Sequence, residues 1–332
     1  MNATTSMRAL ILEQHNAPFM LRTMPRPSAE PGQVLVRIHA SGINPLDVKV
    51  RSGTAAHART NLPAILGMDV AGTVEALGDG VTGFHIGDAV YGMAGGIGGI
   101  PGSMAEFGAF DADLLAKMPA NLSMREAAAL PLIFITAWEG LVDRAGVRKG
   151  QKVLIHGGAG GVGHIAIQIA IARGAKVYAT GSAEQKEYIE SLGATAIDYR
   201  SQTVEQYVAQ HTDGEGFDIV YDTVGGATLD ASFLAAKAYV GHVVSCLGWG
   251  THSLAPLSFR AASYSGVFTL MPLLTGKGRV HHGEIMHEAS ALAEQGKLRV
   301  RLDARRFTFD NATDAHLAIE QRTAAGKIVI DV

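Results

Sequence analysis

The sequence predicts an α/β protein in which a β-rich part comes first and a doubly wound parallel sheet follows. Up to about residue 130 the apolar runs are short and are separated by Gly, Pro and Asp, a spacing typical of strands and turns. From 152 to about 270, short apolar strands alternate with stretches of helical periodicity, as in a parallel sheet covered on both faces. A chain of 332 residues also exceeds what one hydrophobic core usually supports. We therefore expect two domains, one formed by 131–270 and the other by 1–130 with the return segment 271–332.

The individual elements are predicted from these apolar runs, in chain order. In the first part the predicted strands are MRALIL, QVLVRI, DVAGTVEAL and DAVYGM, and in the second they are KVLIH, AKVYAT, ATAID, FDIVYD and VGHVVSC. After Met271 a helix over 284–294 leads into KLRVRLDARRFTF and KIVIDV, which we expect to be strands that return to the first domain. The glycine-rich residues 92–102 are interpreted as a long hairpin loop, with a mobile flap over an active site as the alternative.

The composition argues against several classes of partner. The 31 acidic and 28 basic residues are spread without long runs and give a net charge of -3, so neither nucleic acid nor an anionic membrane is an expected partner. No apolar run has the length of a membrane helix, the N-terminus lacks the pattern of a signal peptide, and we expect residues 1–6 to be a loose tail. The single cysteine, Cys246, allows neither a disulfide within the chain nor a cysteine-based metal cluster, which favours the cytoplasm.

The strongest motif is KVLIHGGAGGVGHIAIQIA, in which an apolar strand runs into glycines spaced as G-x-G-x-x-G. A helical apolar pattern follows the glycines, and the strand AKVYAT comes next. Glycine is needed there because a side chain would block the tight turn and the approach of a pyrophosphate to the helix N-terminus. A purely structural glycine turn is the alternative. The predicted cofactor-binding residues of this turn are Gly158, Ala159, Gly160, Gly161, Val162 and Gly163.

The choice of cofactor is predicted from the end of the next strand. A site specific for NAD places Asp or Glu there to bind the ribose 2′-hydroxyl, whereas this chain has Thr180, Gly181 and Ser182. The absence of a carboxylate favours NADPH. A 2′-phosphate would be bound by hydrogen-bond donors and positive charge from Ser182, Lys186, Tyr199 and Arg200. The alternatives are that Ser182 and Gln185 form a capping box and that Lys186 is a solvated helix residue.

Several motifs in order make the sequence resemble the zinc-independent quinone oxidoreductases of the medium-chain dehydrogenase/reductase superfamily. They are SGINPLDVK, GMDVAGTVEALG, PLIFITAWEGL, the glycine motif and GKIVIDV, and the resemblance covers the chain from Met7 onward. It implies a GroES-like catalytic domain, a Rossmann domain, a cleft between them and a homodimer formed through the Rossmann sheets.

The resemblance also implies roles for single residues. Asn44 corresponds to the family residue near the nicotinamide, Asp47 to a neighbour that supports its loop, and Thr136 to a cofactor contact. Gly326 and Lys327 match the terminal segment that reaches back toward the cofactor. Some members have a tyrosine two residues after the aspartate, where this chain has Lys49, so their quinone contacts do not transfer directly.

The same comparison argues against zinc. Relatives that bind catalytic zinc carry Cys where this chain has Asn44 and His where it has Met68, and an amide and a thioether are poor replacements on Zn²⁺. The cluster of His281, His282 and His287 does not have the i, i+4 spacing of a metal pair between its last two members, so we interpret it as a solvated helix face. We expect no metal site.

The predicted reaction is hydride transfer from NADPH to a small quinone or similar acceptor. Asn44 would donate a hydrogen bond to the acceptor oxygen, Asp47 would support it, and Lys49 or solvent would supply the proton. An enone or alkenal double-bond reductase and a non-catalytic NADPH-binding sensor or structural protein are the alternatives. Asp69 is expected to pack rather than act as a base, and Tyr91 is a candidate substrate contact.

Overall fold

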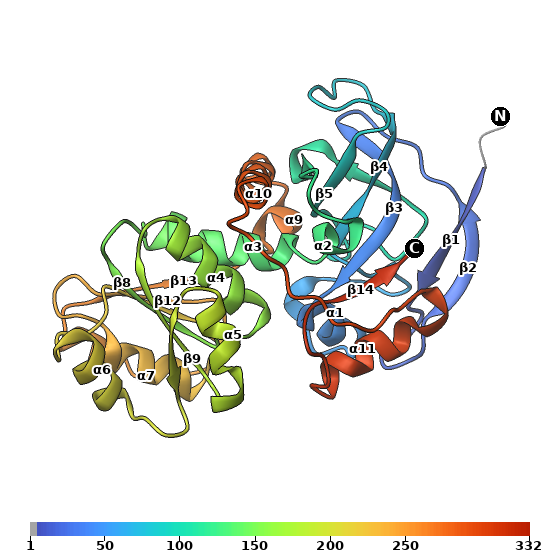
Figure 1. Cartoon of the computed structure of the whole chain (residues 1–332). Coiled ribbons are helices and arrows are strands. Elements are labelled where there is room, and N and C mark those ends of the chain that lie inside the picture. The colour runs from blue at the N-terminus through green and yellow to red at the C-terminus, as the bar shows by residue number, and fades with distance from the viewer. Residues whose placement is uncertain (1–4) are drawn as a thin grey trace. The chain divides into compact units, whose positions relative to one another are not determined.

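The chain leaves its first unit once and returns to it near the end (Figure 1). The computed structural model describes residues 5–332, so residues 1–4 of the predicted loose tail lie outside the described part. The first unit comprises the chain up to Leu132 together with the chain from Leu270 onward, and the second unit comprises the residues between them. In Figure 1 the blue and red ribbons belong to the first unit.

The sheet of the first unit is antiparallel, in the order β14-β3-β4-β5-β7, with β6 also paired to β3. Beside it, β1 and β2 form a two-stranded ribbon. The strands are β1 (Ser6–Ile11), β2 (Met20–Pro25), β3 (Gln33–Ile43), β4 (Asp69–Leu77), β5 (Ala89–Met93), β6 (Phe107–Asp111), β7 (Leu115–Lys117) and β14 (Ile328–Asp331). The four predicted strands are present. The prediction missed β2, β6 and β7. The side chains of β2 are mostly exposed and therefore show no apolar alternation.

The helices of the first unit are mostly short. They are α1 (Pro45–Arg51), η1 (Ala56–Ala58), η2 (Ala112–Leu114), α2 (Met124–Ala128), α9 (Met271–Thr275), α10 (Arg279–Glu294), η5 (Phe309–Asn311) and α11 (Ala312–Glu320). α2 packs closely against the end of β3, because a Cβ at Gly42 would collide with the carbonyl oxygen of Ala128. This contact places the end of β3, and with it the start of α1, next to α2.

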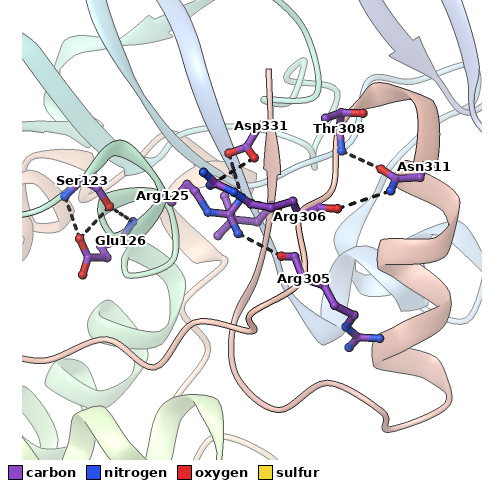
Figure 2. Close-up of polar contacts among 9 residues, drawn as sticks. Ser123, Arg125, Glu126, Arg305, Arg306, Thr308, Asn311 and Asp331 are labelled. Atoms are coloured by element: carbon purple, nitrogen blue, oxygen red, sulfur yellow. Dashed lines mark hydrogen bonds and ion pairs between the residues drawn. The ribbon is translucent and has the colours of Figure 1, made fainter.

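The return segment differs from the prediction. KLRVRLDARRFTF is not a strand, since residues 297–309 contribute only isolated bridges at Leu302 and Phe307. Its alternation reflects the burial of single side chains such as Leu298 and Phe307, while the backbone is held by Arg125 of α2. Figure 2 shows Arg125 between Asp331, at 2.8 Å, and the carbonyl oxygen of Arg305, at 3.3 Å. The predicted last strand is present as β14, which pairs with β3.

The glycine-rich residues 92–102 do not form a hairpin loop, so that interpretation is wrong. The flanking strands β5 and β6 each pair with other strands. The loop instead folds onto neighbouring segments, where the N–H of Gly98 donates to Ala58 and that of Gly102 to Ile65, both over 2.9 Å. Several of its residues are buried, including Ala94 and Ile97.

The second unit is a six-stranded parallel sheet in the order β10-β9-β8-β11-β12-β13. Its strands are β8 (Lys152–His156), β9 (Lys176–Gly181), β10 (Thr195–Asp198), β11 (Ile219–Asp222), β12 (His242–Ser245) and β13 (Ser263–Gly266). Its helices are α3 (Pro131–Trp138), which begins at the end of the first unit, η3 (Glu139–Arg144), α4 (Gly161–Ala172), η4 (Ala183–Gln185), α5 (Lys186–Ser191), α6 (Val204–Thr212), α7 (Ala227–Ala235) and α8 (Ala255–Ser258).

The order of the parallel strands reverses between β8 and β11. The chain runs outward from β8 through β9 to β10, then crosses back to β11 on the other side of β8. As a result α4 and α5 cover one face, and α6 and α7 cover the other, where Tyr207 and Phe233 join the core (Figure 1). In such doubly wound sheets ligands bind at the carboxyl edge beside this reversal. The predicted fold class is therefore confirmed.

Candidate functional site

The glycine turn between β8 and α4 has a backbone that excludes side chains. Gly157 has a φ of 73°, in the left-handed region that favours glycine. A Cβ at Gly163 would collide with the carbonyl oxygen of Gly157, and one at Gly158 would lie 2.7 Å from the Cβ of Ala179. The motif thus forms a strand–turn–helix unit whose glycines allow close packing of backbone segments.

This turn presents the N-terminus of α4 to solvent, where Gly160 and Gly161 are exposed. The first N–H groups of a helix have no partners inside the helix and carry partial positive charge. A pyrophosphate fits such a position because its oxygens accept from these N–H groups. The predicted residues Gly158, Ala159, Gly160, Gly161, Val162 and Gly163 all lie in the turn and the first turn of the helix.

The ends of neighbouring strands meet beside the turn. The N–H of Gly158 donates to the carbonyl of Thr180 near the end of β9, over 2.9 Å. The N–H of Tyr199, which follows β10, donates to the carbonyl of Gly181 over 3.3 Å. Ser182 and Tyr199 therefore follow adjacent strand ends at the same edge of the sheet as the glycine turn.

Two exposed cations lie in the segments that follow these strand ends. Lys186, at the start of α5, lies near Glu190, with 3.8 Å between charged atoms. Arg200 lies 3.9 Å from Glu184 and has its guanidinium carbon 5.7 Å from the centre of the Tyr199 ring. Such long, exposed ion pairs contribute little and break easily, so both cations remain available to an anion.

Ser182 also forms the predicted alternative arrangement. Its N–H donates to Oε1 of Gln185 over 3.0 Å, as in a capping box at the start of η4. The hydroxyl of Ser182 lowers the pKa of Glu184 by hydrogen bonding. Glu184 lies in η4, beyond the end of β9.

His156 and Thr180 form a buried pair that contacts the glycine turn, and the sequence prediction missed this pair. Oγ1 of Thr180 lies 3.2 Å from Nδ1 of His156 and accepts from the N–H of Gly157 over 3.2 Å. Burial lowers the pKa of His156 to about 4, against the opposing charge of Asp222, so the imidazole is neutral at neutral pH. His156 ends the apolar run KVLIH, which is the one signal that could have marked it.

Thr136 lies inside the second unit. Its hydroxyl is 3.2 Å from that of Thr269, and its carbonyl accepts from the hydroxyl of Tyr221 over 2.7 Å. Thr136 is buried, and its predicted contact with the cofactor stays a prediction.

In the first unit, Asn44, Asp47, Asp69 and Lys327 form one hydrogen-bonded set, here called the buried polar cluster. Nδ2 of Asn44 donates to Oδ2 of Asp69 over 2.8 Å, and Oδ1 of Asn44 accepts from Nζ of Lys327. Nζ of Lys327 also donates to the carbonyl of Ile43 over 3.0 Å. Asp47 accepts from the N–H of Asn44 over 2.8 Å. All four cluster side chains are buried.

The topology of the first unit explains why these four residues meet. Asn44 follows β3, and β3 pairs with both β4, which begins at Asp69, and β14, which follows Lys327. Asp47 lies in the first turn of α1, where an acidic residue reaches back to the N-cap backbone. The sequence prediction assigned Asp69 no role in the site. The signal that could have found it is its place at the start of the strand that pairs with β3.

Burial and mutual charge set the protonation of the cluster. Burial raises the pKa of Asp47 to about 7, against hydrogen bonds from the Asn44 and Gly67 N–H groups and the charge of Lys327. Burial raises the pKa of Asp69 to about 6, against the charge of Lys327 and hydrogen bonds from Asn44 and Leu132. Burial lowers the pKa of Lys327, and the two carboxylates oppose this. At neutral pH the carboxyl group of Asp69 is therefore mostly ionised, and the Asn44 amide lies between it and Nζ of Lys327.

The remaining predicted site residues lie close to the cluster in sequence but not in it. Lys49 lies on α1 and is exposed. Gly326 precedes Lys327 at a place where a Cβ would lie 2.6 Å from the carbonyl oxygen of Arg301, so its role here is close packing.

Tyr91 is fully buried, and its hydroxyl donates to the carbonyl of Met286 over 2.8 Å, so it supports α10, and its predicted substrate contact stays a prediction. One other prediction is contradicted. His282 is also buried in α10, so the three histidines do not form a solvated helix face.

Comparison with known proteins identifies the class of protein that this fold and site define. Residues 30–120 match the alcohol dehydrogenase GroES-like domain, and residues 192–330 match a family described as zinc-binding dehydrogenase. The chain is 36% identical over 312 residues to 2-methylene-furan-3-one reductase of Solanum lycopersicum, covering 92% of this chain and 73% of that protein. It is 33% identical over 312 residues to the chloroplastic NADPH-dependent alkenal/one oxidoreductase of Arabidopsis thaliana, with the same coverage of 92% and 73%.

Solved structures agree with this class. The chain matches an alcohol dehydrogenase superfamily protein of Novosphingobium aromaticivorans with 58% identity and a TM-score of 0.96, covering 98% of this chain and 99% of that one. It matches the quinone oxidoreductase of Coxiella burnetii with 30% identity and a TM-score of 0.82, again with 98% and 99% coverage. The fold and glycine turn thus define an oxidoreductase with a nicotinamide-nucleotide-binding unit. The chain belongs to the medium-chain dehydrogenase/reductase superfamily, in its quinone oxidoreductase-like family.

The donor set of this chain does not fit the zinc named in one family description. The Asn44 amide is hydrogen-bonded at both ends, and the neighbouring Met68 offers a buried thioether. Among residues 5–332, no three His, Cys, Asp or Glu side chains are grouped so that they could hold a metal ion. Over the same residues, no helix is long and apolar enough to cross a membrane.

Proposed function

We propose that the protein transfers hydride from NADPH to a quinone or a similar electron-poor acceptor without zinc. The observation that carries this proposal is the glycine turn at the N-terminus of α4, beside a strand end that offers Thr180, Gly181 and Ser182 and no carboxylate. An acidic residue at that strand end would favour NAD, because it binds the ribose 2′-hydroxyl. Lys186 and Arg200 follow the same strand ends and supply positive charge for a 2′-phosphate.

Bound NADPH would supply the hydride. The chain's own part is to stabilise negative charge on the acceptor oxygen. We assign this to Asn44, whose amide oxygen is taken by Lys327 and whose nitrogen keeps a second hydrogen beyond the one given to Asp69. Lys49 or solvent supplies the proton that completes reduction of the acceptor, and Asp47 fixes the start of the helix that carries Lys49.

The names of two relatives support a second acceptor class. The Arabidopsis relative is named for NADPH and alkenals or enones, and the tomato relative for 2-methylene-furan-3-one. An activated carbon–carbon double bond accepts hydride at carbon and also places negative charge on an oxygen. The same Asn44 donor would therefore serve an enone or alkenal reductase.

The experiment that tests the function combines binding and turnover. NADPH and NADH are titrated by fluorescence, and NADPH oxidation is followed with a quinone, an alkenal and a simple ketone. We expect NADPH to bind at least about tenfold more tightly than NADH and either the quinone or the alkenal to be reduced. Turnover of the ketone alone would contradict both acceptor classes. Tight binding with no turnover would indicate a nucleotide-binding protein without catalysis. Activity lost on chelation and restored by zinc would contradict the metal-free mechanism.

We also propose a homodimer formed through the sheet of the second unit. β13 is the edge strand of that sheet, so its outer N–H and C=O groups offer a pairing surface. Phe259, 88% exposed, and Tyr239, 85% exposed, lie at the same end of the sheet, since the N–H of Tyr239 donates to the carbonyl of Arg260 over 2.7 Å. Large exposed apolar side chains of this kind mark association surfaces. The cytoplasm is the compartment we propose, because one cysteine allows no disulfide within the chain.

A further inference from the structure

Asp69 and Lys327 stand at opposite ends of one amide. Lys327 presents an ammonium to Oδ1 of Asn44, and Asp69 presents a carboxylate oxygen to Nδ2, at 2.8 Å. The proposed function uses the Asn44 amide alone and leaves these two buried ionisable side chains without a role. Burying ionisable groups costs desolvation, so their burial is weak evidence for a contribution to stability and needs another explanation.

We propose that Asp69 and Lys327 are positioning residues that hold the amide of Asn44 in a single orientation for the acceptor. This inference rests on the proposed function of Asn44. An ammonium can only donate and a carboxylate can only accept. A flipped amide would set its N–H groups against the ammonium and its oxygen against the carboxylate. The two charges therefore permit one orientation of the amide and exclude the other.

The backbone around both positioning residues is itself fixed. The N–H of Lys327 donates to Arg301 over 2.7 Å, and the carbonyl of Lys327 accepts from the N–H of Asp303 over 2.9 Å. The second carboxylate oxygen of Asp69 accepts from the N–H of Leu132 over 2.9 Å. Because each charge is held by a separate segment, the amide meets a rigid donor on one side and a rigid acceptor on the other.

The orientation has a chemical consequence at the remaining hydrogen of Nδ2. A cation hydrogen-bonded to the amide oxygen draws electron density toward it, which makes the amide N–H groups stronger donors. One N–H is used by Asp69, and the other is the donor that the proposed function gives to the acceptor oxygen. Loss of either charge would thus weaken or misdirect that donor without altering the glycine turn of the second unit.

Two variants of the full-length protein separate positioning from a merely structural role. Asp69→Asn keeps the shape of the side chain but no longer fixes the amide, and it removes one of the two carboxylates that act on Lys327. The double variant Asp69→Asn/Lys327→Met removes both charges, so the desolvation penalty disappears with them. We expect Asp69→Asn to have a lower melting temperature and the double variant to regain much of that loss.

Kinetics and a spectroscopic signature then decide the proposal. With the quinone or alkenal that the wild type reduces, we expect kcat to fall at least about tenfold in both variants while the Kd of NADPH changes less than about threefold. In amide NMR spectra, the side-chain pair of Asn44, assigned by its loss in Asn44→Ala, should exchange with solvent at least about tenfold faster in both variants than in the wild type. A double variant that regains stability and also regains kcat, or that keeps the protected amide pair, overturns the proposal.

A matched control uses the same neighbourhood. Ser103→Ala removes a buried hydrogen bond of 2.8 Å to the backbone carbonyl of Asp69 but leaves both charges in place. Its kcat should stay within about twofold of the wild type, and a loss as large as in Asp69→Asn would also overturn the proposal. The NMR measurement needs neither cofactor nor acceptor. A wild type that fails to bind NADPH therefore refutes the proposed function, while the amide exchange still tests the positioning.

Discussion

At the scale of single residues, cofactor selectivity rests on charges at the surface of the second unit. Lys186 lies 3.8 Å from Glu190 and Arg200 lies 3.9 Å from Glu184, and the strand end beside them carries no carboxylate. A 2′-phosphate offers these cations a stronger partner than Glu190 or Glu184, because it brings more charge and more acceptor oxygens. Discrimination between NADPH and NADH should therefore depend on side chains that contribute little to folding.

The variant Lys186→Ala tests this view. It should weaken NADPH binding by about tenfold, or about 1.4 kcal/mol, and leave NADH binding nearly unchanged. Fluorescence titration of both nucleotides measures the difference. Lys176→Ala is the matched control, since Lys176 is exposed and begins the same strand β9 at the opposite end of the sheet. An equal loss for both nucleotides would reject the contact with the phosphate.

Asp47 makes the stability of the protein depend on pH in a defined direction. Burial raises its pKa from 3.8 to about 7. Between these values the folded chain binds a proton that the unfolded chain has lost, so the free energy of unfolding falls as pH rises, by at most about 1.4 kcal/mol per pH unit. In Asp47→Asn this pH-dependent contribution to the free energy of unfolding is absent, because the amide does not titrate. Urea denaturation at about pH 5 and about pH 7.5 should thus show the variant gaining stability relative to the wild type as pH rises, and the opposite trend would contradict the raised pKa.

At the scale of elements, one side chain of α2 ties the return segment to the sheet of the first unit. Arg125 is 13% exposed and donates to Asp331 over 2.8 Å and to carbonyl oxygens of Val329 and Arg305 (Figure 2). Arg306 reaches the same Asp331 over 3.4 Å but is 68% exposed. Arg125 therefore makes a mostly buried contact with Asp331, whereas Arg306 makes a surface ion pair with the same residue.

Alanine variants of Arg125 and Arg306 test whether the difference in exposure decides their contributions to stability. Arg125→Ala should lower the free energy of unfolding by about 1–3 kcal/mol, because it leaves carbonyl groups and a carboxylate without their donor. Arg306→Ala should change it by less than about 0.5 kcal/mol, since exposed ion pairs contribute little. Urea denaturation of both variants measures the two values. Similar losses in both would show that the contribution of Arg125 does not depend on burial.

At the scale of the whole molecule, the proposed dimer has its own test. Size-exclusion chromatography with light scattering should give twice the mass of the chain, and Phe259→Glu should shift the protein toward monomer by placing charge in an apolar interface. Ile86→Glu is the control, because Ile86 is 72% exposed but lies in the first unit. A wild-type monomer, or a dimer that Phe259→Glu leaves intact, would contradict association through this surface.

Much of the fold could be predicted because the apolar runs of this sequence match the period of their elements. β8, β11 and β12 are buried on both faces, and KVLIH, FDIVYD and VGHVVSC therefore show nearly continuous apolar runs. β2 escaped prediction because its side chains are mostly exposed, and 297–309 was taken for a strand because its alternation imitates one. In the candidate site, Asn44, Asp47 and Lys327 were named individually, but nothing in their spacing indicated that Asp69 would join them.

The sequence by itself determined the glycine turn, the strand before it and the absence of an acidic residue after the next strand, since all three depend on neighbours along the chain. Only the tertiary structure decided that Lys327, near the C-terminus, would share one amide with Asp69. The physical reason is that antiparallel pairing of β3 with both β4 and β14 joins segments far apart in sequence. Burial then shifts the pKa values of Asp69 and Lys327, and burial is a property of the packed molecule.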